Sequence, residues 1–347
     1  MPLTRFEHTY GALLGLALGD ALGFPAAFHR TFQFPAKRRD FLWRTNGELA
    51  RERIIRLTLP FTHRIPAETL APFPTDDTEY AVFAAQTALG LAGEPTADDF
   101  ARAWRERVLP IREDVLTGFS ERAALDNLAR GLLPPATGND NPQHYDDSAA
   151  CRGVSIGLRW AGDPERAARW AEADACVTNA EEGVWAAQAL AVALALLADG
   201  AGLDVALSRA RAQFPIGSWI AQGEATAQAC LRETEGALDL VHALGTRLIN
   251  TVYSYGNAAP ETVPAAFALA ERCGGDLQQA VLAANAIPKS ADSVPALVGA
   301  LCGAVNGPQA VSAIWRAQLD RCRGLCLPFL SGVTLTDTAR ALAEETR

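Results

Sequence analysis

The sequence has little of what disulfide-rich or zinc-stabilised proteins need. Its 347 residues include only seven cysteines and five histidines. The cysteines are an odd number, and the one close pair, Cys322 and Cys326, has no second pair and no neighbouring histidine. This spacing argues against a zinc module and against a disulfide framework. We therefore expect most of the thiols to pack in the core, where free cysteines are usually found.

Positive charge and long apolar runs are scarce as well. Lys and Arg total 31 against 40 Asp and Glu, which gives a formal net charge of −9 and argues against a nucleic-acid-binding surface. The longest apolar run, 184–198, has 15 residues, whereas a membrane span takes about 18 or more. Because the first residues also lack the layout of a signal peptide, we expect a cytoplasmic protein without a membrane segment.

Strand-like alternation is rare, and helix-forming residues, alanine above all, fill most of the chain. The clearest helical patterns cover 11–19, 79–91, 97–108, 149–160, 164–173, 181–198, 260–272 and 292–305. Only 51–59 resembles a strand, within an irregular insertion at about 28–74. No shift in composition marks a linker, so the sequence predicts a single all-α domain over residues 1–347.

The sharpest candidate for chemistry is the segment Pro74-Thr75-Asp76-Asp77-Thr78-Glu79, which leads directly into an apolar helix. Helix capping explains this segment when it is taken alone, because a hydroxyl residue followed by acids is typical of a helix start. The alternative is that the Thr75 hydroxyl and two carboxylates hold Mg²⁺ or a similar hard cation.

Two further segments have the same ambiguity. Asp292-Ser293 opens another apolar helix, 216 positions after Asp76, so the two acids share a site only if the helices converge. Between Gly11 and Gly23, glycines recur four apart on one helix face beside Asp20. Close helix packing, with Asp20 satisfying backbone groups, is the simplest explanation of that third segment.

Taken together, these segments resemble the ADP-ribosylglycohydrolases. The matching stretches are, in order, Gly11-Ala12-Leu13-Leu14-Gly15-Leu16-Ala17-Leu18-Gly19-Asp20-Ala21-Leu22-Gly23-Phe24-Pro25, Thr75-Asp76-Asp77-Thr78, Glu261-Thr262-Val263-Pro264-Ala265-Ala266, Ala291-Asp292-Ser293-Val294 and Gly299-Ala300-Leu301-Cys302-Gly303-Ala304. The resemblance covers nearly the whole chain and points to a divergent member of the dinitrogenase-reductase-activating glycohydrolase type. It implies a compact all-α fold with a metal-binding cleft that takes ADP-ribose.

The resemblance also implies roles for single residues. The expected ligands of one or two Mg²⁺ ions, with Mn²⁺ as a substitute, are Thr75, Asp76, Asp77, Asp292 and Ser293, and the expected base that activates water is Asp76, Asp77 or Asp20. The loop Asp146-Asp147-Ser148-Ala149-Ala150-Cys151-Arg152 resembles the family's Gly-Asn-Gly-Ala-Ala-Met-Arg stretch. By the same likeness Asp147, Ser148 and Glu261 would contact the ligand.

The implied activity is hydrolysis of the glycosidic bond at the ribose anomeric carbon, through an oxocarbenium-like transition state. The substrate would be an ADP-ribosylated protein or an ADP-ribose-like small molecule. Two departures favour an alternative, a catalytically impaired protein that binds ADP-ribose or a nucleotide: Ser290 stands where the family has a metal-binding Asp, and Ala27 where it commonly has an acid. In a third hypothesis the protein is a helical interaction module whose acids all cap helices.

Overall fold

The computed structural model describes residues 2–30, 73–250, 256–287 and 293–344, and of residues 24–30 only the backbone. Within these ranges the regular structure is helical, without strands, and the only pairings of the extended kind are the isolated bridges Asp146–Ala258 and Arg321–Thr334. The all-α prediction is confirmed. The strand-like segment 51–59 and most of the insertion at 28–74 lie outside the described residues.

The first half of the chain contains α1 (Arg5–Arg30), α3 (Asp76–Leu89), α4 (Ala97–Ala103), α5 (Phe119–Ala129), α6 (Ala136–Asn139), α7 (Ser148–Arg159) and α8 (Pro164–Ala175). The second half contains α9 (Glu182–Ala198), α10 (Leu203–Arg211), α11 (Trp219–Glu233), α12 (Ala237–Arg247), α13 (Ala259–Arg272), α14 (Leu277–Ala284), α15 (Ser293–Asn306), α16 (Ala313–Leu319) and α17 (Leu335–Glu344). In the described part of the chain, no helix is long and apolar enough to cross a membrane.

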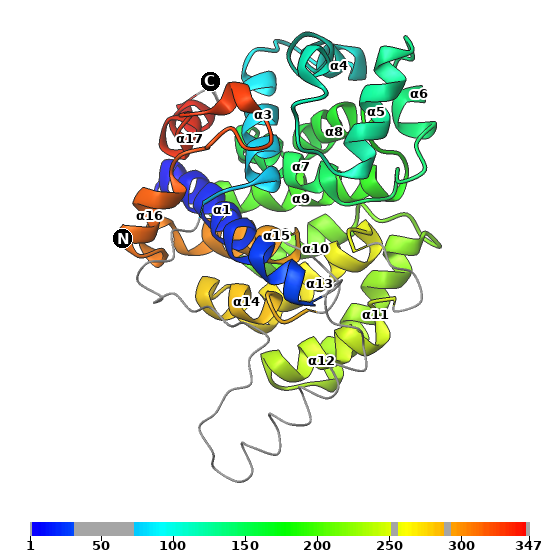
Figure 1. Cartoon of the computed structure of the whole chain (residues 1–347). Helices are drawn as coiled ribbons and strands as arrows, with labels where there is room; N and C mark the ends of the chain where they lie inside the picture. The colour runs from blue at the N-terminus through cyan, green and yellow to red at the C-terminus, as the bar shows by residue number, and fades with distance from the viewer. Residues whose placement is uncertain (1, 31–72, 251–255, 288–292, 345–347) are drawn as a thin grey trace.

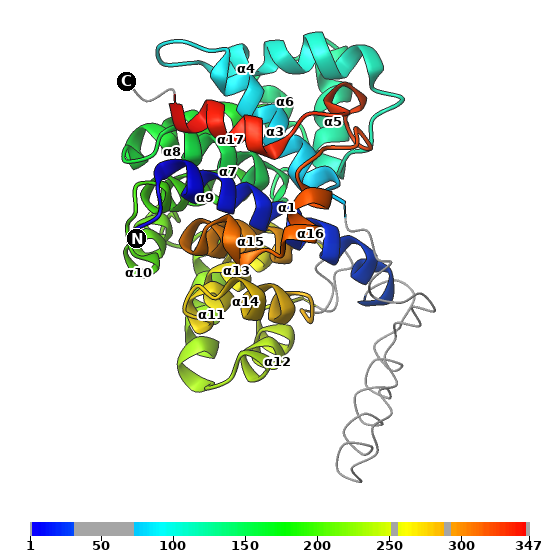
Figure 2. The ribbon, with the colours of Figure 1, turned by 90° about the vertical axis from the view of Figure 1, so that its left-hand side faces the viewer.

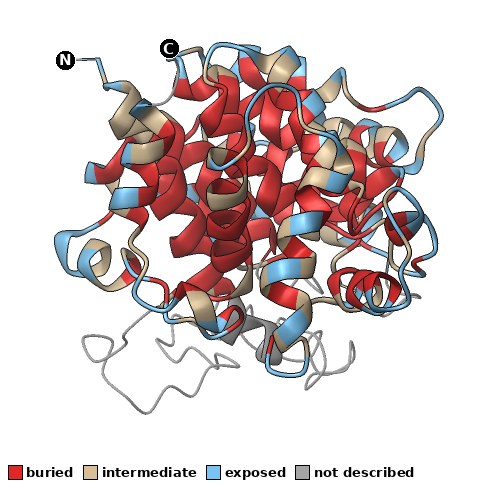
Figure 3. Ribbon diagram, turned by 90° about the horizontal axis from the view of Figure 1, so that it is seen from above, coloured by how far each residue is buried: buried red, intermediate tan, exposed pale blue. Residues whose placement is uncertain are grey.

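The long helices pack in layers, and α1 from the start of the chain meets α15 from its last quarter at the centre (Figure 1). Helix α1 lies along α15, and α15 packs in turn on α13 and α14. On the other side of this pair, α3 packs on α7, α7 on α9, and α9 on α8. Figure 3 shows that the buried residues concentrate in these long helices, whereas the exposed ones follow the outer turns and loops.

The contact between α1 and α15 is made of glycines. A Cβ atom added at Gly15 would overlap the carbonyl oxygen of Gly299, and one added at Gly299 would overlap that of Gly15. Gly11 and Gly303 exclude Cβ atoms from one another in the same way. The two backbones therefore touch directly, as the four-residue spacing predicted, and α1 runs beside α15 along this line (Figure 2).

Several predicted helix ends are confirmed by backbone conformation. A glycine with positive φ follows each of three helices: Gly162 after α7 (86°), Gly200 after α9 (86°) and Gly275 after α13 (79°). Glycine enters this region without steric cost. The helix predicted at 97–108 differs, because α4 ends at Ala103 and continues as a π-helical turn over Trp104–Val108. The buried Trp104 stacks on Tyr80 of α3, with 5.8 Å between ring centroids, at the start of this turn.

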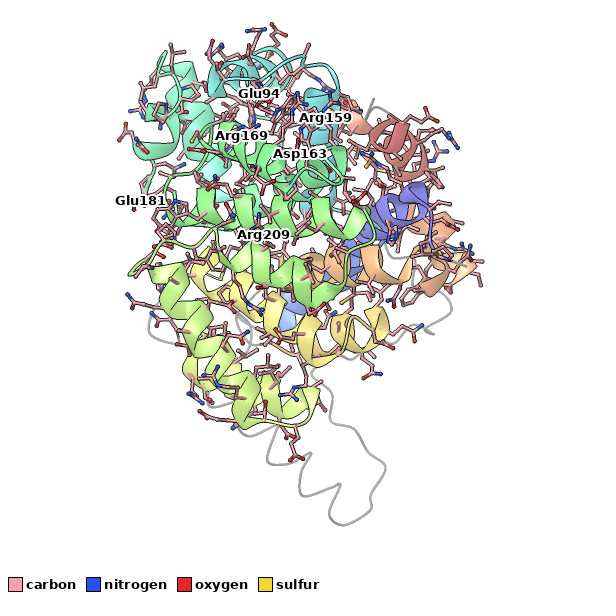
Figure 4. The ribbon with its side chains drawn as sticks, turned by 180° about the vertical axis from the view of Figure 1, so that it is seen from behind. Glu94, Arg159, Asp163, Arg169, Glu181 and Arg209 are labelled. Carbon is pink, nitrogen blue, oxygen red and sulfur yellow. The ribbon has the colours of Figure 1, made fainter. Side chains whose placement is uncertain are left out.

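Exposed ion pairs connect some of the outer elements. Glu94, in the turn before α4, forms an ion pair with Arg166 at 3.0 Å and accepts a hydrogen bond from Arg169 at 3.5 Å, both on α8, and Arg209 of α10 pairs with Glu165 at 2.6 Å. Glu94, Arg169 and Arg209 are labelled in the view from behind in Figure 4. Exposed pairs contribute little to stability, so the fold depends mainly on its packed core.

The glycine contact yields a first prediction. We expect Gly15→Ala to lower the free energy of unfolding by about 1–3 kcal/mol or more, because the added methyl group forces two packed helices apart. The matched control is Gly90→Ala at the end of α3, where a Cβ atom would stand 3.5 Å from its nearest neighbour, the Thr87 carbonyl oxygen. Urea unfolding of both variants measures the difference. Equal stability of the two variants would contradict a direct backbone contact.

Candidate functional site

A small cleft, with about 20 Å³ of space for water-sized groups, opens where α3, α5 and α7 meet the segment before α13. Its lining consists of Asp76, Asp77, Tyr80, Gly118, Glu121, Asp146, Asp147, Ser148, Cys151 and Asn257. Five of these ten residues are acids, and none is Lys, Arg or His. The acids come from three separate parts of the sequence, so the tertiary fold concentrates negative charge at one point.

Asp76 and Asp77 enter the cleft from the first turn of α3. Asp77 is buried and accepts a hydrogen bond on Oδ1 from the Cys151 thiol at 2.9 Å, whereas Asp76 is partly exposed. The positive end of the helix dipole favours acids in this turn. Desolvation nevertheless raises the pKa of the Asp76 carboxyl above its ordinary value. Thr75 precedes them as N-cap residue, but its hydroxyl does not cap the helix.

Asp20 holds the start of α3 in place from α1. Its fully buried carboxylate accepts from the backbone N–H groups of Thr75 at 2.8 Å and Thr78 at 3.2 Å, and from both threonine hydroxyls. Burial and the charge of Asp76 raise the pKa of Asp20 to about 7, against the effect of these hydrogen bonds. Asp20 thus satisfies backbone groups, as its sequence context predicted, and it does not line the cleft.

Asp147 brings the start of α15 to the same cleft. Its buried carboxyl is hydrogen-bonded to the side chains of Thr262 and Ser293. Burial and the neighbouring Asp146 raise the pKa of Asp147 well above its ordinary value. Since Ser293 opens α15, the segments around positions 76 and 293 do converge. Asp292 itself lies outside the described residues.

The remaining predicted site residues have different positions. Ser148 lines the cleft, and its hydroxyl oxygen is 2.8 Å from that of Ser120. Glu261 is buried in the first turn of α13 and is not one of the lining residues. Ser290 and the side chain of Ala27 lie outside the described part of the structure.

Glu121 is a cleft residue that the sequence did not indicate, and Asp146 belongs to the loop that the resemblance singled out but was given no role of its own. Behind them lies Arg152, fully buried, with Nε 2.7 Å from Asp174, Nη2 donating to Thr178 at 2.6 Å and Nη1 3.7 Å from Glu121. Burial raises the pKa of Glu121 to about 7, Asp146 adds to the rise and Arg152 opposes it. Nothing in the local sequence of α5 distinguishes Glu121 from a solvent-facing acid.

Glu79 has a structural role in place of the expected cap. Its buried carboxylate accepts from the backbone N–H groups of four consecutive residues, 324–327, at 2.7, 3.0, 2.8 and 2.8 Å. It therefore fastens the loop before α17 to α3. A carboxylate that accepts from four backbone N–H groups has its acceptor capacity used within the fold.

The oxygen donors of the cleft suit a hard cation such as Mg²⁺. Asp76 and Asp77 present carboxylates there, whereas Thr75 is buried, is not one of the lining residues and donates its hydroxyl hydrogen to Asp20. Among the described residues no three His, Cys, Asp or Glu side chains already form a metal cage. Asp292, the other carboxylate of the expected set, is not among those residues.

Comparison with known proteins identifies the family of the chain. The sequence model of the ADP-ribosylglycohydrolase family matches residues 1–347. Among solved structures, an "ADP-ribosylglycohydrolase-related protein complex" superposes with a TM-score of 0.61 at 25% sequence identity, and the match covers 99% of each chain. No curated protein matches the sequence.

The hydrogen bonds of Asp20 lead to a second prediction. Asp20→Asn should lower the free energy of unfolding by about 2–4 kcal/mol, since an amide has one acceptor oxygen and its NH₂ group would face buried donors. Chemical denaturation measures this loss, with Asp126→Asn at an exposed position of α5 as the control. A D20N protein of normal stability that lacks activity would instead support Asp20 as the base.

Glu121 should make stability depend on pH. Because its pKa is about 7 in the fold and ordinarily 4.5, the folded protein keeps this proton to higher pH than the unfolded chain. Stability is therefore lost as pH rises through this interval, by about 1–3 kcal/mol from this group. The free energy of unfolding is measured in chelator across this pH range. It should fall less steeply with pH for Glu121→Gln than for the control Glu113→Gln, whose side chain is 82% exposed. Equal slopes would contradict the assignment.

Proposed function

Because the chain belongs to the ADP-ribosylglycohydrolase family, we propose that it is a Mg²⁺-dependent hydrolase. It cleaves the glycosidic bond at the ribose anomeric carbon of an ADP-ribosylated side chain or a related ribosyl compound. The observation that carries this proposal is the convergence of Asp76 and Asp77 with Asp147, which is itself bonded to Ser293, around one acidic cleft. Capping alone does not require these segments to meet.

In this proposal Thr75, Asp76, Asp77, Asp292 and Ser293 hold the cation, for which Mn²⁺ is the natural substitute. When bound, such an ion orients ribose hydroxyls and lowers the pKa of water. Asp76 is the best placed base, because it lines the cleft and is more exposed than Asp77. Its carboxylate takes a proton from a water molecule as the water oxygen bonds to the anomeric carbon and the leaving group departs with the bonding electron pair.

Asp147 and Ser148 form the opposite wall and bind the ligand in this proposal. The Oδ2 atom of Asp147 is buried and has no hydrogen-bond partner among the residues that the structure describes. A buried polar atom without a partner is costly, so a ligand hydroxyl that donates to Oδ2 would gain binding energy there. The neighbouring Ser148 hydroxyl adds a second polar contact at the start of α7.

A second candidate function is binding of ADP-ribose or a nucleotide without turnover. The sequence observations that favour it are Ser290 and Ala27, which replace acids common in the family. Both functions need the cleft, but only hydrolysis needs a base and an activated water. The two candidates therefore make the same prediction for ligand affinity and opposite predictions for product release.

The proposal is tested by release of ADP-ribose from ADP-ribosyl-arginine and from ADP-ribosylated protein in the presence of Mg²⁺ or Mn²⁺. We expect turnover by the unaltered chain and its loss in chelator. Asp76→Asn should lower kcat by at least about 100-fold, because it removes the base. Asp126→Asn, a matched change at an exposed acid of α5, should leave kcat unaltered.

Calorimetry with ADP-ribose separates the alternatives. Binding without turnover by the unaltered chain would reject hydrolysis in favour of the binding function. If neither binding nor turnover occurs, both candidates fail and a purely structural role for the acids is left. Turnover that persists unchanged in chelator would reject the metal-dependent form of the proposal.

A further inference from the structure

Cys151 is the one thiol among the lining residues of the cleft, and it faces an acid. It lies on α7, three and four positions after Ser148 and Asp147, which places the three side chains on one helix face. The residue is 1% exposed, and its Sγ donates to Oδ1 of Asp77 at 2.9 Å. The thiol thus connects α7 to a carboxylate that belongs to the proposed catalytic group.

The scaffold leaves this thiol little freedom to move away. Beyond Cys151, Gly153 and Gly157 of α7 are pressed against the backbone of Ala187 and Ala191 of α9, so closely that an added Cβ atom would overlap each carbonyl oxygen. The adjacent Arg152 is held by Asp174 and Thr178. Since α7 is anchored from position 152 onward, directly after Cys151, the distance between the thiol and α3 is set by this packing.

We propose that Cys151 is a positioning residue for Asp77. A carboxylate rotates about its Cβ–Cγ bond, and a hydrogen bond to one oxygen selects one orientation of the group and so directs the other oxygen. A charged acceptor strengthens even the weak S–H donor. This inference rests on the proposed function, because the orientation of Asp77 matters only if that carboxylate holds the cation or the substrate.

The comparison of residue types favours the same conclusion. In the family's Gly-Asn-Gly-Ala-Ala-Met-Arg stretch, the position that corresponds to Cys151 is a methionine, and a thioether has no hydrogen to donate. The contact with Asp77 is therefore a feature of this chain and not a general property of the motif. An ordinary core cysteine would need only to fill space, as a methionine does.

The chemical test compares donors with non-donors at two cysteines. Cys151→Ser keeps a hydrogen to donate, so kcat/KM should stay within about threefold of the unaltered chain, whereas Cys151→Ala should lose about 10- to 100-fold, mainly in kcat. Cys302 of α15 is equally buried but lies outside the cleft. At a cysteine that only packs, serine is the worse replacement, because it buries an extra polar group. C302A should therefore be at least as stable and active as C302S.

A second readout does not depend on turnover. The infrared S–H stretching band that is lost in C151A should lie at the lower frequency of a hydrogen-bonded thiol, and Asp77→Asn should move it to higher frequency. Equal kcat/KM values for C151S and C151A, or a band that D77N leaves in place, would overturn the positioning role. If the unaltered chain releases no ADP-ribose, the proposed function fails, and the infrared band alone then decides whether the thiol binds Asp77.

Discussion

The direct backbone contact between α1 and α15 is the constraint on which the rest of the structure depends. Because Gly11 faces Gly303 and Gly15 faces Gly299, the two helices run antiparallel. The later part of α1, with Asp20, therefore lies toward the beginning of α15. Asp20 holds the first turn of α3, and Ser293 bonds to Asp147 at the start of α7. One glycine line thus sets both walls of the cleft.

The cleft gathers charges that would repel one another in isolation. Burial raises the pKa of Glu121 and Asp147, and in both cases the negative charge of Asp146 adds to the rise. Arg152, a cation close behind the lining, is already engaged with Asp174 and Thr178. A fold that keeps several acids together at such a cost is poised to gain from a bound cation or a ligand rich in hydrogen-bond donors.

Much of the fold and part of the site were predictable from residue types. The glycine spacing in 11–19 predicted a close helix contact, and the glycines after the helices predicted where they end. Asp76 and Asp77, which line the cleft, could be singled out as a pair of acids at a helix start, a pattern that helix capping explains equally well. Glu121 and Cys151 were not recognisable as site residues, since a single acid or thiol within a helix has the same local pattern whether it faces solvent, core or cleft.

By itself, the sequence determined the all-helical class, several of the helix ends and the family, because periodicity, glycine positions and ordered motifs are properties of neighbouring residues along the chain. Only the tertiary structure decided which acids share a cleft. It removed Asp20 and Glu79 from the lining by engaging their carboxylates with backbone donors, and it added Glu121 and Cys151. The physical reason is that burial and hydrogen-bond partners arise from helices packed across long sequence separations, and these packings assign each carboxylate either to the scaffold or to the cleft.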